Sequence, residues 1–502
     1  METKPQQEIL FRWLAAIGCF AVLIFFFSPP WWVFRVWSRV PETGYLLEVR
    51  RGACVLFQVD HLGAEIPDRL HSVIQWRLLF PLIGQVLSLP PPVVLGLAGL
   101  GCVFVLAFVV TVLRRRGVGW GDSGLIAMML GATSWFFTST GWLGYFDSWL
   151  ALALLLVAFA RTPWPVWLAC LWAPWVDERF AVAVPLALFC RYLLRADDAD
   201  TGAPVFRRVQ EFILPAGLIA AFLVVRLGVL PGYSAPAATP GGYLATQHSF
   251  AAPWSRIALG IWDGLRVAWF LVVGAVCLSW RRSWHALALG LATLVLVGLG
   301  IFTAQDFSRS MTMVLPVAMY GAILLVKLAP GWRPWALQAG AAAALVLPAH
   351  HVMSDRVNPI YYLHHEIAAL QSPPPAIMPE LFELRGILAM EQGEFAKAEA
   401  DLSLAIKLSD QPAGPAKQRG LLYASQGRWA DARRDFALMV EREPDNPDAW
   451  FMRAQAALAL GDAAAAQGDI QHALAVAPKD WATRPDVARF LARPVFAAQN
   501  PR

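Results

Sequence analysis

Apolar stretches that alternate with short polar loops fill residues 1–350, and this pattern constrains the fold more than any other feature. A helix that spans a bilayer needs about 20 mainly apolar residues. By that measure we identify eleven candidates: 10–28, 92–113, 120–139, 143–160, 163–176, 179–195, 211–230, 256–280, 285–302, 311–329 and 335–350. The whole chain is 57% hydrophobic and only 15% charged, whereas soluble domains carry about 25% charged residues. The sequence therefore predicts an all-α, polytopic membrane domain over residues 1–350.

Basic residues in the short loops predict how this domain lies in the membrane. If every candidate crosses, one side collects the positive charges: Arg114, Arg115, Arg116, Arg161, Arg191, Arg195, Arg207, Arg208, Arg281, Arg282, Lys327 and Arg333. Such loops face the cytoplasm. We expect a bacterial inner-membrane protein with its N-terminus inside, a long outer loop at 29–77 and its C-terminal tail outside. An error of one span would put the tail inside.

The first apolar stretch is predicted to stay as an anchor, because Pro29-Pro30-Trp31-Trp32 follows it where a signal peptide would have small residues. An amphipathic helix near 70–88 is expected to lie along the membrane interface.

The tail repeats itself at a constant spacing. Gly386, Gly420 and Ala454 are in register, as are Gly393, Gly427 and Gly461, then Ala398, Ala432 and Ala466, and then Leu402, Phe436 and Ile470. Small residues let two helices approach closely, glycine closes the turn, and the large apolar residue fills the layer. The pattern resembles the tetratricopeptide family, whose repeat length is about 34 residues and whose arrays bind a protein or peptide in a groove. We assign 351–378 to a linker, 379–480 to three repeats, and 481–502 to a capping helix and tail.

Charged residues within or beside the apolar stretches gather at the predicted outer side. A charge in a membrane span is costly and marks a functional candidate by default. Nine residues from five regions share this depth: Asp147, Asp177, Glu178, Arg179, Arg226, Asp263, Arg266, Asp306 and Arg309. One interpretation is a set of structural ion pairs, such as Asp263 with Arg266 at i,i+3. The other is a polar cavity in which arginine binds phosphate and the acids bind sugar hydroxyls or transfer protons.

The first outer loop adds five acids, of which Asp60 is favoured as a catalytic base. It stands in VDHLGAE, just before the stretch HSVIQWRLLFP that returns to the membrane. A carboxylate fixed there could take a proton from an acceptor hydroxyl. For any single loop acid, an ordinary solvated side chain is the simpler explanation.

A many-span chain with a long acidic first outer loop and an interfacial helix resembles the GT-C superfamily of polyprenyl-phosphate-dependent glycosyltransferases. Its combination with an outward repeat tail is similar to the transmembrane O-mannosyltransferases of that superfamily. The resemblance implies that Asp60 is the loop carboxylate and that Arg179 and Arg309 contact the lipid phosphate. It also implies a lipid-linked sugar as donor substrate; we predict no metal and no separate cofactor. The first loop lacks a clear pair of acids, and no second diagnostic motif is present.

Two other classes of function stay open. The chain could be a non-catalytic membrane scaffold whose repeats recruit envelope-assembly proteins, or a transporter. Transporters usually have broken spans in both halves, and only one broken region, around Asp177-Glu178-Arg179, is evident here. The sequence has no nucleotide-binding glycine loop in a fitting position and no basic stretch interleaved with aromatics. We therefore expect the lipid bilayer, a lipid-linked substrate and a protein as partners, and no nucleic acid.

Overall fold

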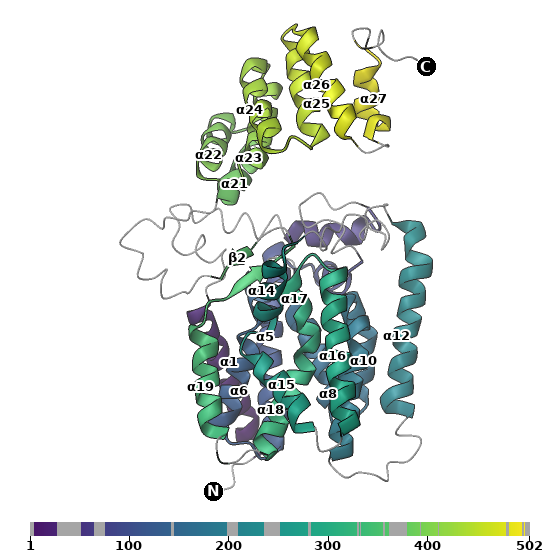
Figure 1. The fold of residues 1–502 in the computed structure, drawn as a ribbon, viewed down its shortest axis with the longest axis vertical. Helices are drawn as coiled ribbons and strands as arrows, with labels where there is room; N and C mark the ends of the chain where they lie inside the picture. The colour runs from purple at the N-terminus through teal and green to yellow at the C-terminus, as the bar shows by residue number, and fades with distance from the viewer. Residues whose placement is uncertain are drawn as a thin grey trace, which may run out of the picture. The chain divides into compact units, whose positions relative to one another are not determined.

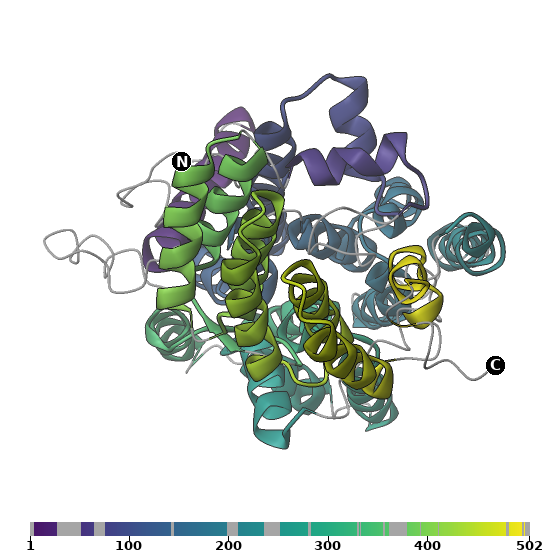
Figure 2. The same cartoon turned by 90° about the horizontal axis from the view of Figure 1, so that it is seen from above.

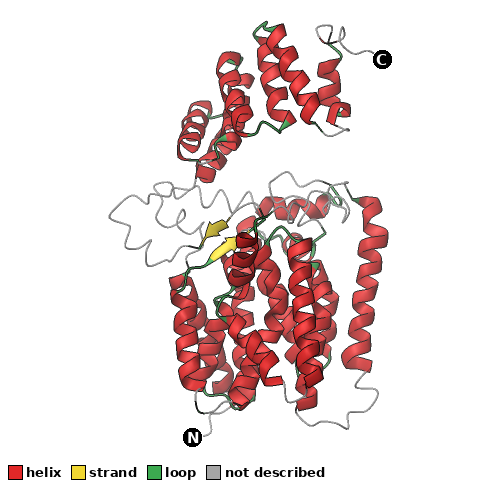
Figure 3. Cartoon of the chain, in the orientation of Figure 1, coloured by secondary structure: helices red, strands yellow, loops and turns green. Residues whose placement is uncertain are grey.

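The protein is described here by a computed structural model, which divides into two compact units (Figure 1). A helical bundle lies within residues 1–372 and a smaller unit within residues 373–502. The structure describes residues 5–27, 52–64, 76–141, 145–197, 209–234, 252–279, 283–328, 331, 333–354, 357–360, 379–391, 393–409, 411–477, 481–493 and 496. Helices make up nearly all of both units, and one small hairpin is the exception (Figure 3).

The first half of the bundle contains α1 (Pro5–Phe26), a helix at 52–60, α4 (Leu79–Val86), α5 (Pro91–Arg115), α6 (Trp120–Gly131), α7 (Ser134–Gly141), α8 (Asp147–Phe159), α9 (Trp164–Trp172) and α10 (Arg179–Asp197). The second half contains η4 (Val209–Ile213), α12 (Leu214–Val224), η5 (Val225–Val229), α14 (Trp254–Leu265), α15 (Ala268–Leu278), α16 (Ser283–Thr303), α17 (Phe307–Ser310), η10 (Met311–Val314), α18 (Leu315–Leu328) and α19 (Arg333–Val346). The hairpin pairs β1 (His350–Val352) with β2 (Val357–Pro359).

Each predicted apolar stretch contains helical residues, but the count of eleven spans is not confirmed. Five continuous helices among the described residues are long and apolar enough to cross a membrane: Gln6–Phe26, Pro91–Arg115, Gln210–Tyr233, Trp284–Phe302 and Phe307–Leu328. A sixth candidate joins α14 and α15, which meet at an angle of 82°. The stretch 120–139 is divided between α6 and α7. Composition alone could not show these breaks, because the residues on both sides of them are apolar.

Apolar side chains on the outside of the bundle support contact with lipid. On α16, Leu287, Leu291 and Leu294 are each more than half exposed. The helix formed by η4, α12 and η5 lies at the periphery in both views (Figures 1 and 2) and is likewise apolar outward. Water would make such continuous surfaces unfavourable, whereas lipid solvates them.

Close helix contacts hold the centre of the bundle together. A Cβ atom at Gly321 in α18 would lie 1.9 Å from the carbonyl oxygen of Leu271 in α15, so these two helices need glycine where they touch. The pair α5 and α8 is fixed by hydrogen bonds from Ser148 Oγ to the Ala98 carbonyl (2.7 Å) and from Trp149 Nε1 to the Leu97 carbonyl (2.8 Å). These contacts keep the beginning of α8, where Asp147 lies, in a defined position.

The bundle has two distinct ends. Phe11 at the start of α1 contacts Trp120 (6.2 Å between ring centroids), and Arg114 at the end of α5 lies over the same ring (4.2 Å). At the other end β1 packs against α17, where Val352 N donates to Ser308 Oγ (3.0 Å). The start of α1 and the hairpin therefore lie at opposite ends (Figure 1). An odd number of crossings between them would produce this arrangement.

The tail unit consists of three helical hairpins and a cap. Its helices are α21 (Pro379–Glu391), α22 (Phe395–Leu408), α23 (Ala413–Ser425), α24 (Trp429–Arg442), α25 (Pro447–Ala459), α26 (Ala463–Val476) and α27 (Pro485–Leu491). Gly393, Gly427 and Gly461 close the hairpins with φ of 76°, 74° and 81°, a left-handed conformation that favours glycine. Phe490 of α27 packs on Phe451 with ring centroids 5.2 Å apart, as expected for a cap.

A repeated ion pair joins the two helices of each hairpin, and the sequence analysis missed it. Arg385, Arg419 and Arg453 contact Asp401, Asp435 and Asp469, respectively. In the second hairpin, Arg419 Nη2 lies 2.7 Å and Nε 2.9 Å from the two oxygens of Asp435. The three carboxylates are buried. The partners have the same separation in every pair, and the pair recurs once in each repeat, so the repeat period itself contained the signal.

We predict that Arg419→Ala weakens the second hairpin by about 1–3 kcal/mol, because it leaves the Asp435 carboxylate buried without its cation. Native-state hydrogen exchange of the α23 and α24 amides in the purified full chain measures the loss. Arg434→Ala is the matched control: its side chain is 78% exposed, so a change below about 0.5 kcal/mol is expected. Equal losses in both variants would contradict the assignment. Replacing both partners with apolar residues (Arg419→Met with Asp435→Leu) should recover much of the stability.

Candidate functional site

Asp147 is the centre of a buried charge network at the end of the bundle where the hairpin lies. It begins α8, and Thr138 Oγ1 in α7 donates to its Oδ2 (2.6 Å). Arg309 in α17 donates to both of its oxygens (2.7 and 2.9 Å), and Arg179 Nη2 at the start of α10 donates to Oδ1. The Asp147 side chain is 1% exposed, so two guanidinium groups take the place of water.

Asp177 and Asp306 extend the network on either side. Arg179 donates to Asp177 from its backbone nitrogen (2.9 Å) and from Nε and Nη2 (2.9 and 2.7 Å). Arg77, which precedes α4, reaches the same carboxylate (3.1 Å). Asp306 lies just before α17 and accepts from Arg309 Nη1 (2.7 Å), with His351 Nε2 of the hairpin 3.5 Å away. Residues from five parts of the chain thus meet at one place.

The network is electrically balanced. It contains three carboxylates (Asp147, Asp177, Asp306) and three guanidinium groups (Arg77, Arg179, Arg309). A buried ion is tolerated only when it is paired and hydrogen-bonded. Each carboxylate here has at least one guanidinium partner, and of these carboxylate oxygens only Asp306 Oδ1 is buried without a hydrogen bond among the described residues. Arg309 also lies over the Tyr145 ring (3.7 Å). The network can therefore stabilise the bundle without any ligand.

The four remaining predicted site residues near this end occupy separate contacts. Glu178 pairs with Arg226 in η5. Asp263, fully buried in α14, lies 2.9 Å from His350 Nδ1. Arg266 donates to the carbonyls of Ala132 (3.0 Å), Ala344 (2.8 Å) and Leu347. It has φ of 48° and stands at the sharp turn between α14 and α15.

Arg266 is therefore placed to bind the ends of other helices rather than to face a cavity. Its guanidinium lies 5.0 Å from the centroid of the Phe27 ring, at the end of α1. Carbonyls at helix ends lack intrahelical partners, so one buried arginine can satisfy several of them. The spacing Asp263-x-x-Arg266 suggested a local ion pair, but the turn at Arg266 breaks the helix on which that prediction depends.

Asp60 is the last residue of a short helix at 52–60, within the segment 29–77 that was predicted as the first outer loop. Its carboxylate is exposed and accepts a hydrogen bond from Gln85 Nε2 of α4 (2.7 Å). Within the described residues Asp60 forms no ion pair, unlike Asp147 and Asp177. The other first-loop acids (Glu42, Glu48, Glu65 and Asp68) lie outside the described residues. Residues 65–75 also lie outside the described residues. Of the interfacial helix predicted near 70–88, the structure therefore describes only α4.

Four side chains of this region were missed in the sequence: Thr138, Arg77, His350 and His351. Arg77 stands in the stretch HSVIQWR, and the two histidines lie at the end of the last apolar stretch. An inspection of titratable residues at helix ends could have found these three, but not the neutral Thr138. The described residues contain no group of three His, Cys, Asp or Glu side chains that could hold a metal ion. The expectation that the protein uses no metal stays a prediction.

Comparison with known families identifies the tail. A model of the tetratricopeptide repeat matches residues 413–456, the second hairpin and the first part of the third. The tail holds tetratricopeptide repeats. No curated protein and no solved structure matches the chain. The resemblance of the bundle to a glycosyltransferase superfamily is therefore not supported by a match and stays a prediction.

We predict that Asp147→Asn destabilises the bundle strongly, by about 3 kcal/mol or more, because it leaves two buried arginines facing a neutral group. The midpoint of thermal unfolding in detergent checks this. Glu178→Gln is the control: its side chain is 40% exposed and has one cationic partner, so a loss below about 1 kcal/mol is expected. If Asp147→Asn were as stable as Glu178→Gln, the network would not be what holds α8, α10 and α17 together.

Proposed function

We propose that the chain is a membrane transferase that moves a sugar from a polyprenyl-phosphate-linked donor to an acceptor hydroxyl at the outer face. The observation that carries the proposal is the contrast between Asp60 and the other acids at this end. Asp147, Asp177 and Asp306 are taken up by arginines, whereas Asp60 is exposed and held by one neutral amide. A general base needs a free lone pair within hydrogen-bond reach of the proton that it accepts.

In this mechanism Asp60 accepts the proton of the acceptor hydroxyl while the oxygen attacks the anomeric carbon. The bond from that carbon to the phosphate oxygen breaks, and the polyprenyl phosphate leaves as an anion. Of the two arginines suggested as phosphate ligands, Arg179 is favoured, because its side chain is 15% exposed and that of Arg309 only 3%. Both arginines already bind Asp147. Because Arg309 is the more deeply buried of the two, it is better suited to holding the network than to binding substrate.

Positively charged loops favour the basic end of the bundle as cytoplasmic. This orientation would put Asp60 and the start of the tail at the outer face of a bacterial inner membrane, as the proposed chemistry requires. The repeats could then bind the acceptor or a partner protein there.

We predict that Asp60→Asn abolishes transfer while the protein remains folded and in the membrane. Loss of a general base typically costs about 10²–10⁴-fold in rate. The measurement is complementation of a strain that lacks this protein, with surface glycans and lipid-linked sugars profiled together. A glycan should disappear and its lipid-linked donor should accumulate. Asp122→Asn, an acid in the first turn of α6 at the other end of the bundle, is the matched control and should complement fully.

The second candidate is a non-catalytic scaffold, and the balanced network favours it. If the buried charges serve only to hold the bundle, the repeats become the main functional element, since such arrays usually bind proteins. We predict for this alternative that deletion of residues 379–480 abolishes function whereas Asp60→Asn leaves it intact. Cross-linking of the full chain in cells, compared with the deletion, would identify the partner. The opposite result, loss with Asp60→Asn and activity without the repeats, would exclude a pure scaffold.

A further inference from the structure

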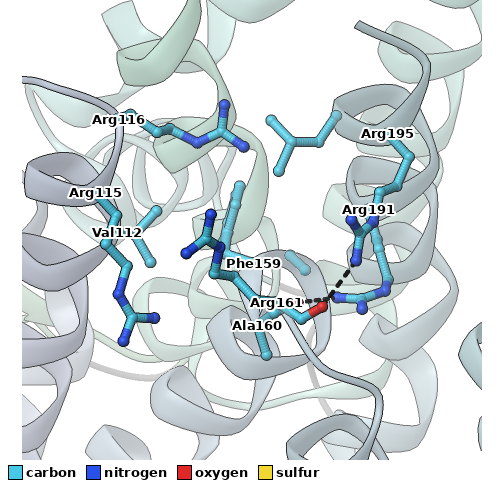
Figure 4. A pocket seen from close by; sticks show the side chains of 10 residues that line it. Val112, Arg115, Arg116, Phe159, Ala160, Arg161, Arg191 and Arg195 are labelled. Atoms are coloured by element: carbon cyan, nitrogen blue, oxygen red, sulfur yellow. Dashed lines mark hydrogen bonds between the residues drawn. The ribbon is translucent and has the colours of Figure 1, made fainter. Parts of the chain in front are cut away.

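A pocket at the basic end of the bundle contains a concentration of arginine that neither proposed function uses. Five of its ten lining residues are arginines, and the other five are apolar. Arg115 and Arg116 come from the end of α5, Arg161 from the turn between α8 and α9, and Arg191 and Arg195 from α10. Figure 4 shows Arg115 and Arg116 on one side of the pocket, Arg191 and Arg195 on the other, and Arg161 between them.

The lining of this pocket is not balanced in charge, in contrast to the network around Asp147. The Glu211 carboxylate in η4 forms ion pairs with both Arg191 (3.3 Å) and Arg195 (3.1 Å). Arg191 Nη1 also donates to the Ala160 carbonyl (2.6 Å), and Arg195 Nη2 to the Arg161 carbonyl (2.9 Å). Among the described residues, no acid lines the pocket. The lining side chains therefore carry five positive charges, and the Glu211 carboxylate, which is paired with two of them, offsets one.

The concentration of like charges makes this lining unfavourable without a ligand. The Arg191 side chain is 1% exposed and is paired with Glu211, so its guanidinium has a fixed place in the lining. Arg115, Arg116 and Arg161 are exposed at the rim. Like charges held close together repel each other, weakly at the exposed rim and more strongly towards the buried part of the lining. An anion among the five groups would lower that energy, and the planar guanidinium matches the oxygens of phosphate in a bidentate manner.

The size and position of the pocket indicate which anion it takes. Its volume is about 310 Å³, at the lower end of the range for ligand pockets, which suits a phosphate group with its ester substituent. It lies where α5, a candidate span, ends in its run of arginines, the level at which lipid headgroups lie. Basic pockets between membrane helices on the cytoplasmic side typically bind anionic headgroups. Apolar residues such as Phe159 and Leu194 supply a wall for the first methylenes of a lipid.

We propose that this five-arginine pocket binds a phosphate group, supplied by the headgroup of an anionic phospholipid. The site is separate from Asp60 and the Asp147 network and does not depend on the transferase or scaffold proposal.

The test uses the purified full chain in nanodiscs of phosphatidylcholine alone or with cardiolipin added. Native mass spectrometry counts the retained cardiolipin, and thermal unfolding measures the stabilisation that binding confers. In the variant Arg116→Gln/Arg161→Gln, each lost arginine is expected to lower affinity about fivefold, or about 25-fold for both, at about 1 kcal/mol per basic residue. Both residues lie at the exposed rim, so the fold should be retained. Unfolding in pure phosphatidylcholine checks this.

Arg114→Gln is the control, because it removes the same charge from the same helix end. Arg114 donates to the Val118 carbonyl (2.6 Å) and does not line the pocket. Wild type and Arg114→Gln should both be stabilised by cardiolipin, and the double variant should lose most of that stabilisation. A second arm titrates inorganic phosphate into phosphatidylcholine nanodiscs. Stabilisation by phosphate alone, abolished in the double variant, would overturn the lipid as the source. Equal responses to cardiolipin in all three proteins would overturn the site itself.

Discussion

The structure of this bundle depends on how an apolar environment treats charge. A carboxylate or guanidinium removed from water is stable only with a partner and with its hydrogen bonds satisfied. Asp147 meets this requirement through Arg179, Arg309 and Thr138. These contacts join the neighbouring helices α7 and α8 to α10 and to α17, which lies far away in the chain. One carboxylate thus helps to fix the relative positions of four helices. The same requirement explains Arg266, which donates to three carbonyls at the ends of two other helices, α6 and α19, from the turn between α14 and α15.

The two ends of the bundle treat charge in opposite ways. At one end, the three carboxylates and three guanidinium groups of the Asp147 network contact each other directly. At the other, five arginines surround a pocket, and two of them share the carboxylate of Glu211. A balanced network is complete in itself, whereas an unbalanced one favours a ligand of opposite charge. From this difference we propose a structural role for most of the predicted site residues, a chemical role for Asp60, and phosphate binding at the basic end.

The tail follows a different principle, in which one solution is repeated. Each hairpin uses a left-handed glycine to turn, a small residue to bring its helices together, and a buried arginine–aspartate pair to join them. At Gly420, for example, an added Cβ would lie 2.5 Å from the Phe436 ring. Because the same contacts recur in every hairpin, the period of the sequence and the period of the structure are the same. Stacked units of this kind present a continuous surface to a partner.

Local pattern determined much of this protein. Apolar length predicted the helices of the bundle, and the repeat period predicted the hairpins and their glycine turns, because each of these is decided by residues close together in sequence. Only tertiary structure decided the rest. The angle of 82° between α14 and α15 and the hairpin β1–β2 depend on packing against distant elements. The sequence likewise could not show which charged residues contact each other. Asp147 and Arg309 are 162 positions apart, and no spacing rule links them. The sequence shows that a charged residue in an apolar stretch needs a partner, but only the folded structure shows which residue that partner is.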